Sequence, residues 1–174
     1  MRFLLKTMLI IISALVIIIF HLTVVYLFPS SWSKINVIFL FLLLYLVWSG
    51  NSQAVWLTAL THLFLEFLSL TPFGLLLFSS VLSMLFSYWL FHSLFINHSW
   101  YTAMVLTAGT LFFFRIFYLL GLILFDPELQ LNSNFWLNFT QSVAWEIGLT
   151  TLTMGLVYLL AAKFSRRFNP SLIH

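Results

Sequence analysis

Residues 66 to 74 read Glu-Phe-Leu-Ser-Leu-Thr-Pro-Phe-Gly, and this stretch ends one hydrophobic segment and begins the next. Pro72 cannot extend the preceding helix, and Gly74 accepts backbone dihedrals that other residues resist. Glu66 places a carboxylate just before this turn, in a chain where charge is scarce. An ionisable group within a hydrophobic segment is costly, so it indicates function. The pattern predicts a helical hairpin in which Glu66, Pro72 and Gly74 shape the turn or bind a partner.

The composition places the chain in a membrane. Its 174 residues are 63% hydrophobic and only 6% charged, so a soluble domain of this length would lack the polar surface to cover itself. A membrane helix needs about 20 mostly apolar residues, which allows roughly six spans and leaves no room for a separate soluble domain. We therefore predict an all-α, polytopic integral membrane helix bundle that forms a single domain. The expected spans are 7–28, 35–48, 54–70, 75–91, 100–125 and 135–162.

The second and third expected spans are short. One alternative is therefore that residues 35–70 form a single kinked, re-entrant unit. Their combined length suffices for two crossings, so six spans remain the main prediction. No internal repeat or linker divides the chain.

Positive charge lies at both ends of the chain, while the acidic sequence Asp126-Pro127-Glu128 falls between the fifth and sixth expected spans. The positive-inside rule then predicts that both termini are cytoplasmic and that the number of spans is even. Residues 29–34 become an external loop, in which Trp32 and Lys34 anchor at the membrane interface. The terminal basic residues are Arg2, Lys6, Lys163, Arg166 and Arg167.

Charge and cysteine content exclude several classes of function. The net charge of +3 comes from Lys and Arg that gather mainly at the termini, with no surface stripe, so we expect no nucleic-acid partner. Cysteine is absent, which removes a disulfide framework, a thiol nucleophile and a thiolate metal site. Membrane lipid is the partner that composition predicts.

Polar residues recur at helical spacing within three of the expected spans. In the third span, such residues fall on one helical face, which we expect to look into the bundle. Small side chains on the fourth span predict close packing against a neighbouring helix. These residues are Thr58, His62, Glu66 and Ser69 in the third span, Ser80, Ser83 and Ser87 in the fourth, and Ser142, Glu146, Thr150 and Thr153 in the sixth.

Besides Glu66, two fully charged residues lie well inside expected spans, Arg115 in the fifth and Glu146 in the sixth. Each lies roughly 15 Å from the outer end of its span, at about 1.5 Å per residue. Antiparallel neighbours joined by a short loop would bring the two side chains together. Because a mid-span Arg costs about 2.5 to 3.5 kcal/mol on insertion scales, pairing would offset part of that cost. We predict an intramembrane ion pair that locks helix register or serves a proton or substrate site.

The sequence offers little that indicates catalysis. His62 stands one helical turn from Glu66, a spacing that can orient an imidazole or bind a metal. However, the chain contains no His-Glu-x-x-His motif, no further ligand cluster and no Gly-x-Ser-x-Gly motif. We therefore expect no metal, no cofactor and no enzyme activity, with an intramembrane serine protease as the remaining catalytic alternative. His92 and His98 fall in a predicted cytoplasmic turn.

In its six short-looped spans and its sequence from Glu66 to Gly74, the chain resembles the bacterial rod shape-determining protein MreD family. That family's pattern has an acid, two apolar residues, a few small or polar residues, and a glycine after a turn. Glu66 and Gly74 take the positions of the acid and the glycine. The family often carries an acid in its fifth span, where this chain has Arg115, and Glu146 would replace that acid.

The resemblance implies a non-enzymatic subunit of the bacterial cytoplasmic (inner) membrane. Such a subunit binds a MreC-like scaffold partner and wall-synthesis proteins, and it supports lateral peptidoglycan synthesis and the regulation of cell shape. These properties are expectations from the resemblance alone.

A second hypothesis is that the chain is a substrate-binding S component of an energy-coupling-factor vitamin transporter. The chain is also similar to such components in size and in its expected number of spans. Its pocket would open outward, and Glu66 with Trp136 or Asn138 would line it. Two features favour the scaffold hypothesis. We expect few convergent hydrogen-bonding side chains near the outer face, and the first span has no Ala-x-x-x-Ala pair for docking a coupling subunit.

Overall fold

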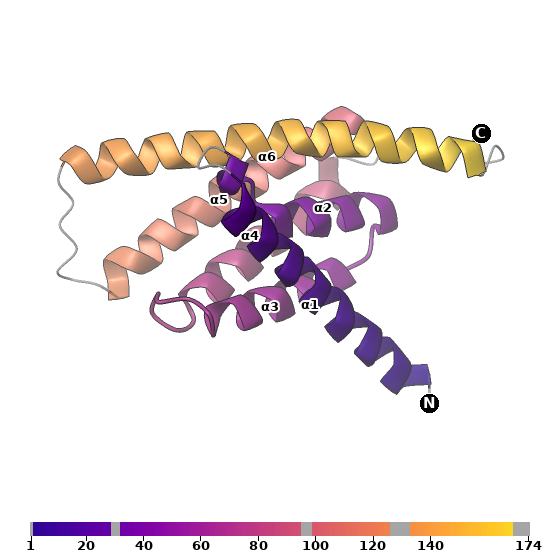
Figure 1. The fold of residues 1–174 in the computed structure, drawn as a ribbon, viewed down its shortest axis with the longest axis horizontal. Coiled ribbons are helices and arrows are strands. Elements are labelled where there is room, and N and C mark those ends of the chain that lie inside the picture. The colour runs from indigo at the N-terminus through magenta and orange to yellow at the C-terminus, as the bar shows by residue number, and fades with distance from the viewer. Residues whose placement is uncertain (1, 29–31, 95–98, 126–132, 169–174) are drawn as a thin grey trace.

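A computed structural model describes residues 2–28, 32–94, 99–125 and 133–168 (Figure 1). Within those ranges every regular element is helical. The elements are α1 (Arg2–Leu27), a short 3₁₀ helix η1 (Trp32–Lys34), α2 (Val37–Ser49), α3 (Gln53–Glu66), α4 (Leu75–Leu94), α5 (Trp100–Phe125) and α6 (Ser133–Phe168).

Four helical segments are long and apolar enough to cross a membrane: Met8–Leu27, Leu75–Leu94, Trp100–Phe125 and Ser133–Phe164. They indicate a membrane-embedded helical protein. The two helices between α1 and α4 are shorter, with 13 residues in α2 and 14 in α3. At about 1.5 Å per residue each is roughly 20 Å long, against about 30 Å for the hydrocarbon core. By length alone, neither α2 nor α3 matches a full crossing.

The short helix α2 forms the centre of the bundle. It contacts α1, α3, α5 and α6, and it lies under the long α6 in Figure 1. Apolar side chains cover it on most sides, and Phe39, Leu42, Leu43 and Leu46 are fully buried. A helix that is hydrophobic all round belongs in a core, which is where α2 lies.

The side chain of Asn36 caps the start of α2, and Gly50 caps its end. The side chain of Asn36 accepts a hydrogen bond from the Phe39 N–H, and so α2 begins at Val37 and not at Ile35 as the sequence predicted. At the other end Gly50 adopts a left-handed conformation with φ of 61° and donates its N–H to the Leu46 carbonyl.

The turn after α3 starts earlier than predicted. The helix ends at Glu66, whereas the expected span ran to residue 70. Ser69 donates its N–H to the Glu66 carbonyl, and its hydroxyl accepts the Thr71 N–H at 3.1 Å. Such local bonds compete with helix formation, so Ser69 leaves the polar face on which we expected it. The remaining buried polar residues of α3 are Thr58, Thr61, His62 and Glu66.

Small hydroxyl side chains pack α4 against α5. Ser80, Ser83 and Ser87 are buried, as is the neighbouring Ser79, and their hydroxyls donate to backbone carbonyls of α4. The Ser87 hydroxyl also meets the Thr110 hydroxyl of α5 at 2.5 Å. Side chains this small let two helix backbones approach closely.

The carboxyl end of α4 extends to Leu94, so the prediction that His92 lies in a connecting turn was wrong. His92 Nε2 lies 3.1 Å from the Gly50 carbonyl oxygen, a contact that holds the end of α4 against the α2–α3 connection. The contact gives the Gly50 carbonyl, which lies outside the helices, a hydrogen-bond partner. His98 lies outside the described residues.

Gly74 provides a test of the turn. Its φ of 97° is strained for any residue with a side chain, although no atom lies within 4 Å of where a Cβ would stand. We predict that Gly74→Ala lowers the free energy of unfolding by about 1 to 3 kcal/mol through backbone strain alone. Thermal unfolding of the purified protein in detergent measures the change.

The matched control is Gly148→Ala on α6, where a Cβ also meets nothing within 4 Å and φ is helical. Alanine is favoured there by up to about 1 kcal/mol. Equal stability changes in the two variants would contradict a strained turn.

Candidate functional site

Arg115 of α5 and Glu146 of α6 form an ion pair inside the bundle. The Arg115 Nε and Nη2 atoms both donate to Glu146 Oε2. At about 1.5 Å per residue, Arg115 lies roughly 15 Å from the end of α5 and Glu146 roughly 20 Å from the start of α6. The Glu146 side chain is 5% exposed and that of Arg115 is 27% exposed. The carboxylate is therefore enclosed, while one side of the guanidinium stays accessible.

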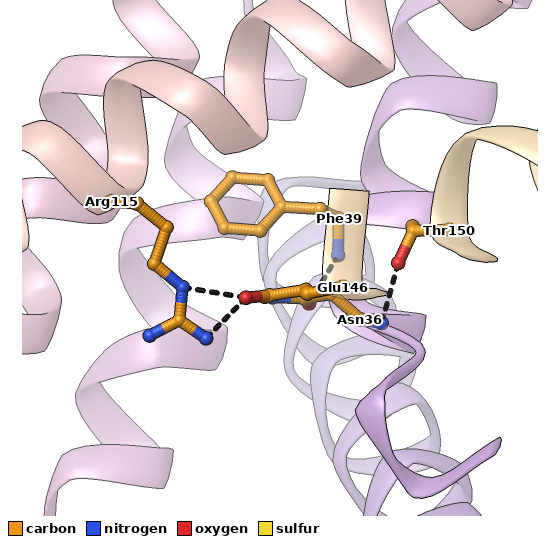
Figure 2. Close-up of polar contacts among 5 residues, drawn as sticks. All are labelled: Asn36, Phe39, Arg115, Glu146 and Thr150. Carbon is orange, nitrogen blue, oxygen red and sulfur yellow. Dashed lines mark hydrogen bonds and ion pairs between the residues drawn. The ribbon is translucent and has the colours of Figure 1, made fainter. Parts of the chain in front are cut away.

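Asn36, at the start of α2, completes the pair. Its Nδ2 donates to Glu146 Oε1 at 2.9 Å, and its backbone N–H donates to the Thr150 hydroxyl at 2.9 Å. Figure 2 shows the carboxylate between Arg115 on one side and Asn36 on the other. Each carboxylate oxygen thus has a donor, so neither oxygen is left buried without a hydrogen bond. The cluster of Asn36, Arg115, Glu146 and Thr150 joins α2, α5 and α6, and we call it the polar cluster.

Two aromatic rings on α5 flank the Arg115 guanidinium. The guanidinium carbon lies 5.6 Å from the Phe114 ring centroid and 5.9 Å from that of Tyr118. Cations at this distance are attracted to the ring face, and the attraction is larger away from water. The rings hold the guanidinium laterally, so its position does not depend on Glu146 alone.

An open cavity of about 260 Å³ lies beside the polar cluster. Residues of all six α-helices and of η1 contribute to its wall. Polar and charged side chains of α1, η1, α3, α5 and α6, together with the Asn36 cap of α2, converge there. The polar lining residues are His21, Ser33, Lys34, Asn36, His62, Arg115, Tyr118, Ser142 and Glu146.

The predicted pocket residues are not part of this wall. Glu66, Trp136 and Asn138 do not line the cavity, and Trp136 is 41% exposed. Lys34 lines the cavity, because η1 packs against α1 and α6. Its anchoring at the membrane interface stays a prediction.

Three residues of this site were missed at the level of sequence: His21, Lys34 and Asn36. Signals for two of them were present. Asn36 directly precedes an apolar helix, which is the preferred place for an N-cap, and His21 interrupts an otherwise apolar span. Nothing in the residues around Lys34 distinguishes an inward-facing lysine from one at the interface.

Glu66 is a buried cap of α4. Its side chain is 3% exposed, and Oε1 accepts the Leu76 N–H at 3.0 Å across the turn. A carboxylate at a helix N-terminus satisfies a backbone donor and interacts favourably with the helix dipole. Oε2 is buried without a partner among the described residues. Of the roles that the sequence left open for Glu66, the structure places it as the cap.

His62 lies among aromatic side chains. Its Nδ1 lies 3.0 Å from the Thr58 carbonyl oxygen, and its ring centroid lies 5.2 Å from that of Phe39. In the part of the chain that the structure describes, no three His, Asp or Glu side chains gather closely enough to hold a metal ion. The contacts assign His62 to the cavity wall and the core.

No protein-family model, curated protein or solved structure matched the chain in three comparisons.

A double-mutant cycle tests the ion pair. We predict that Arg115→Ala and Glu146→Ala each destabilise the protein by about 3 to 5 kcal/mol, because each leaves the other charge buried and unpaired. The double mutant should lose clearly less than the sum of the two. Additive losses, measured by reversible unfolding in mixed micelles, would mean that the two side chains do not interact.

The Glu66 cap has its own pair of variants. Glu66→Ala removes the acceptor for the Leu76 N–H and should cost about 0.5 to 2 kcal/mol of stability. Glu66→Gln keeps an oxygen acceptor on a side chain of the same size, so it should stay within about 0.5 kcal/mol of the unaltered protein. If thermal unfolding shows the Gln variant to be as unstable as the Ala variant, charge and not capping sets the role of Glu66.

Proposed function

We propose that this protein is a non-enzymatic inner-membrane subunit of the bacterial cell-elongation machinery, similar to MreD. The observation that carries the proposal is the hairpin from Glu66 to Gly74. Its acid caps the next helix at 3.0 Å, and its glycine has a φ of 97°, so both positions of the family pattern have a physical role in this chain. The resemblance thereby rests on residues that shape the fold.

The proposal includes six membrane-embedded segments with both termini in the cytoplasm. In Figure 1 the first and last described residues lie towards one end of the bundle, as does the α2–α3 connection. The α3–α4 turn lies towards the opposite end. This alternation supports six passages in which α2 and α3 cover only part of the membrane thickness. In this proposed topology the hairpin faces the outer side, where a scaffold protein would meet it.

A partner would contact the apolar side chains of the turn and not the acid. Glu66 is buried, whereas Phe67, Leu68, Leu70 and Phe73 are each at least 66% exposed. The Phe67 and Phe73 rings lie 5.8 Å apart, which gives the turn one aromatic surface. We propose that the MreC-like scaffold binds this surface and that Glu66 and Gly74 hold it in shape.

The cavity favours a second candidate, the S component of a vitamin transporter. The sequence favoured the scaffold hypothesis over this one, because few convergent polar groups were expected. In the structure, polar groups from α1, η1, the start of α2, α3, α5 and α6 surround a cavity of about 260 Å³, which is near the lower size limit of small-molecule pockets. A subunit that captures a small polar molecule would use such a site.

Affinity capture separates the two candidates. We expect the full-length tagged protein, purified from its own membrane in mild detergent, to bring down a scaffold protein and wall-synthesis proteins identified by mass spectrometry. Recovery of an ATPase pair with a transmembrane coupling subunit would instead support the transporter. Recovery of neither set would contradict both.

Variants of the turn make the capture specific. Leu70→Ser and Phe73→Ser should reduce recovery of the scaffold several-fold, because truncating apolar anchors weakens an interface. Leu160→Ser on α6 is the matched control, since Leu160 is 57% exposed and lies far along the chain from the turn. An equal loss in all three variants would assign the effect to general instability.

A further inference from the structure

The cavity beside the polar cluster is lined by two cationic side chains, Lys34 and Arg115, and one carboxylate, Glu146. A guanidinium has five N–H donors, and Arg115 uses Nε and Nη2 on Glu146. Figure 2 shows its remaining terminal nitrogen pointing away from the carboxylate. Both Glu146 oxygens already accept bonds, from Arg115 and Asn36. The carboxylate therefore neutralises Arg115 without consuming all of its donors.

Further donors line the cavity on other elements. Lys34 of η1 brings an ammonium group with three donors, and its charge has no acidic partner among the cavity residues besides the engaged Glu146. His21 of α1 has a buried Nδ1 without a partner among the described residues. His62 of α3 donates Nδ1–H to the Thr58 carbonyl oxygen, so Nε2 of its neutral ring is an acceptor and is not counted among these donors. The lining contains two cations, Lys34 and Arg115, and one carboxylate, Glu146, so its formal charge is +1.

This arrangement favours a phosphate among the oxyanions. The donors stand on η1, α1 and α5, so they approach from different walls of one cavity. A phosphate carries oxygens in several directions around one atom, whereas a carboxylate has two oxygens in one plane. Arg and Lys are the side chains that proteins use for phosphate. Apolar residues, among them Val25, Leu65 and Leu76, complete the wall and would accommodate a hydrocarbon part.

We propose that this cavity binds a phosphate group with Lys34, Arg115 and His21, supplied by a membrane lipid headgroup or by a water-soluble phosphate ester. At about 260 Å³ the cavity holds a headgroup but no pair of acyl chains, which would continue into the bilayer. This site rests on neither of the proposed roles. Failure of the capture experiment leaves phosphate binding untouched, and failure of phosphate binding leaves the partner surface untouched.

Thermal unfolding of the full chain in a neutral maltoside detergent tests the site, with its tryptophans as the fluorescent reporter. The three probes are dioleoylphosphatidylglycerol, dioleoylglycerol and glycerol 3-phosphate. We expect phosphatidylglycerol to raise Tm and dioleoylglycerol, which has the same chains and no phosphate, to raise it much less. Equal effects of these two lipids, with no rise from glycerol 3-phosphate, would overturn the proposal. A rise with glycerol 3-phosphate identifies a water-soluble source, and no rise with it identifies the lipid.

A pair of lysine variants locates the effect. Lys34→Gln should weaken the apparent affinity for phosphatidylglycerol about tenfold, since one charged hydrogen bond is lost. Lys163→Gln removes the same charge at an exposed position near the end of α6 and should leave the affinity unchanged. Equal losses in both variants would indicate attraction to overall positive charge and overturn the site. If Lys34→Gln does not fold, the comparison of the two lipids on the unaltered chain still decides.

Discussion

The carboxylate of Glu146 is the group on which the arrangement of this bundle depends. It belongs to α6, accepts two bonds from Arg115 of α5 and one from Asn36 at the start of α2. In a low-dielectric interior an unpaired carboxylate or guanidinium is far more costly than a paired one. The arrangement of α2, α5 and α6 that brings these groups into contact is therefore favoured. This arrangement fixes the start of α2 against α5 and α6. The side chains of α2 then lie at the centre of the apolar core, and its first residues form one edge of the cavity.

Much of the helical pattern was predictable, and the exceptions have local causes. The predicted bounds of α5 match, and α4 begins at the predicted Leu75, because long apolar runs end there at polar or glycine residues. The starts and ends that shifted are set by side chains that bond the backbone: Asn36 at α2, and Ser69 with Thr71 after α3. Hydropathy registers where apolar residues lie, but it does not register which polar side chain takes a backbone donor.

The site divides in the same way. Arg115 and Glu146 could be assigned to one depth by counting residues along two neighbouring helices, and the structure brings them into contact. The cavity could not be predicted in this way, because its wall comes from all six α-helices and from η1, which packs against α1 and α6. Scarcity of charge along the chain suggested a poor binding site. The fold nevertheless brings the few polar groups of the chain together, and this is sufficient to form a polar cavity.

The bond between Asn36 and α6 has a consequence for how the protein is made. The Asn36 backbone N–H and the Thr150 hydroxyl that accepts it are 114 positions apart in sequence. While the ribosome is still adding α3, α4 and α5, the start of α2 lacks its hydrogen-bond partners on α6. These bonds form only once α6 has been made, so the position of α2 against α1, α3 and α5 is completed by a helix that follows all of them in the chain.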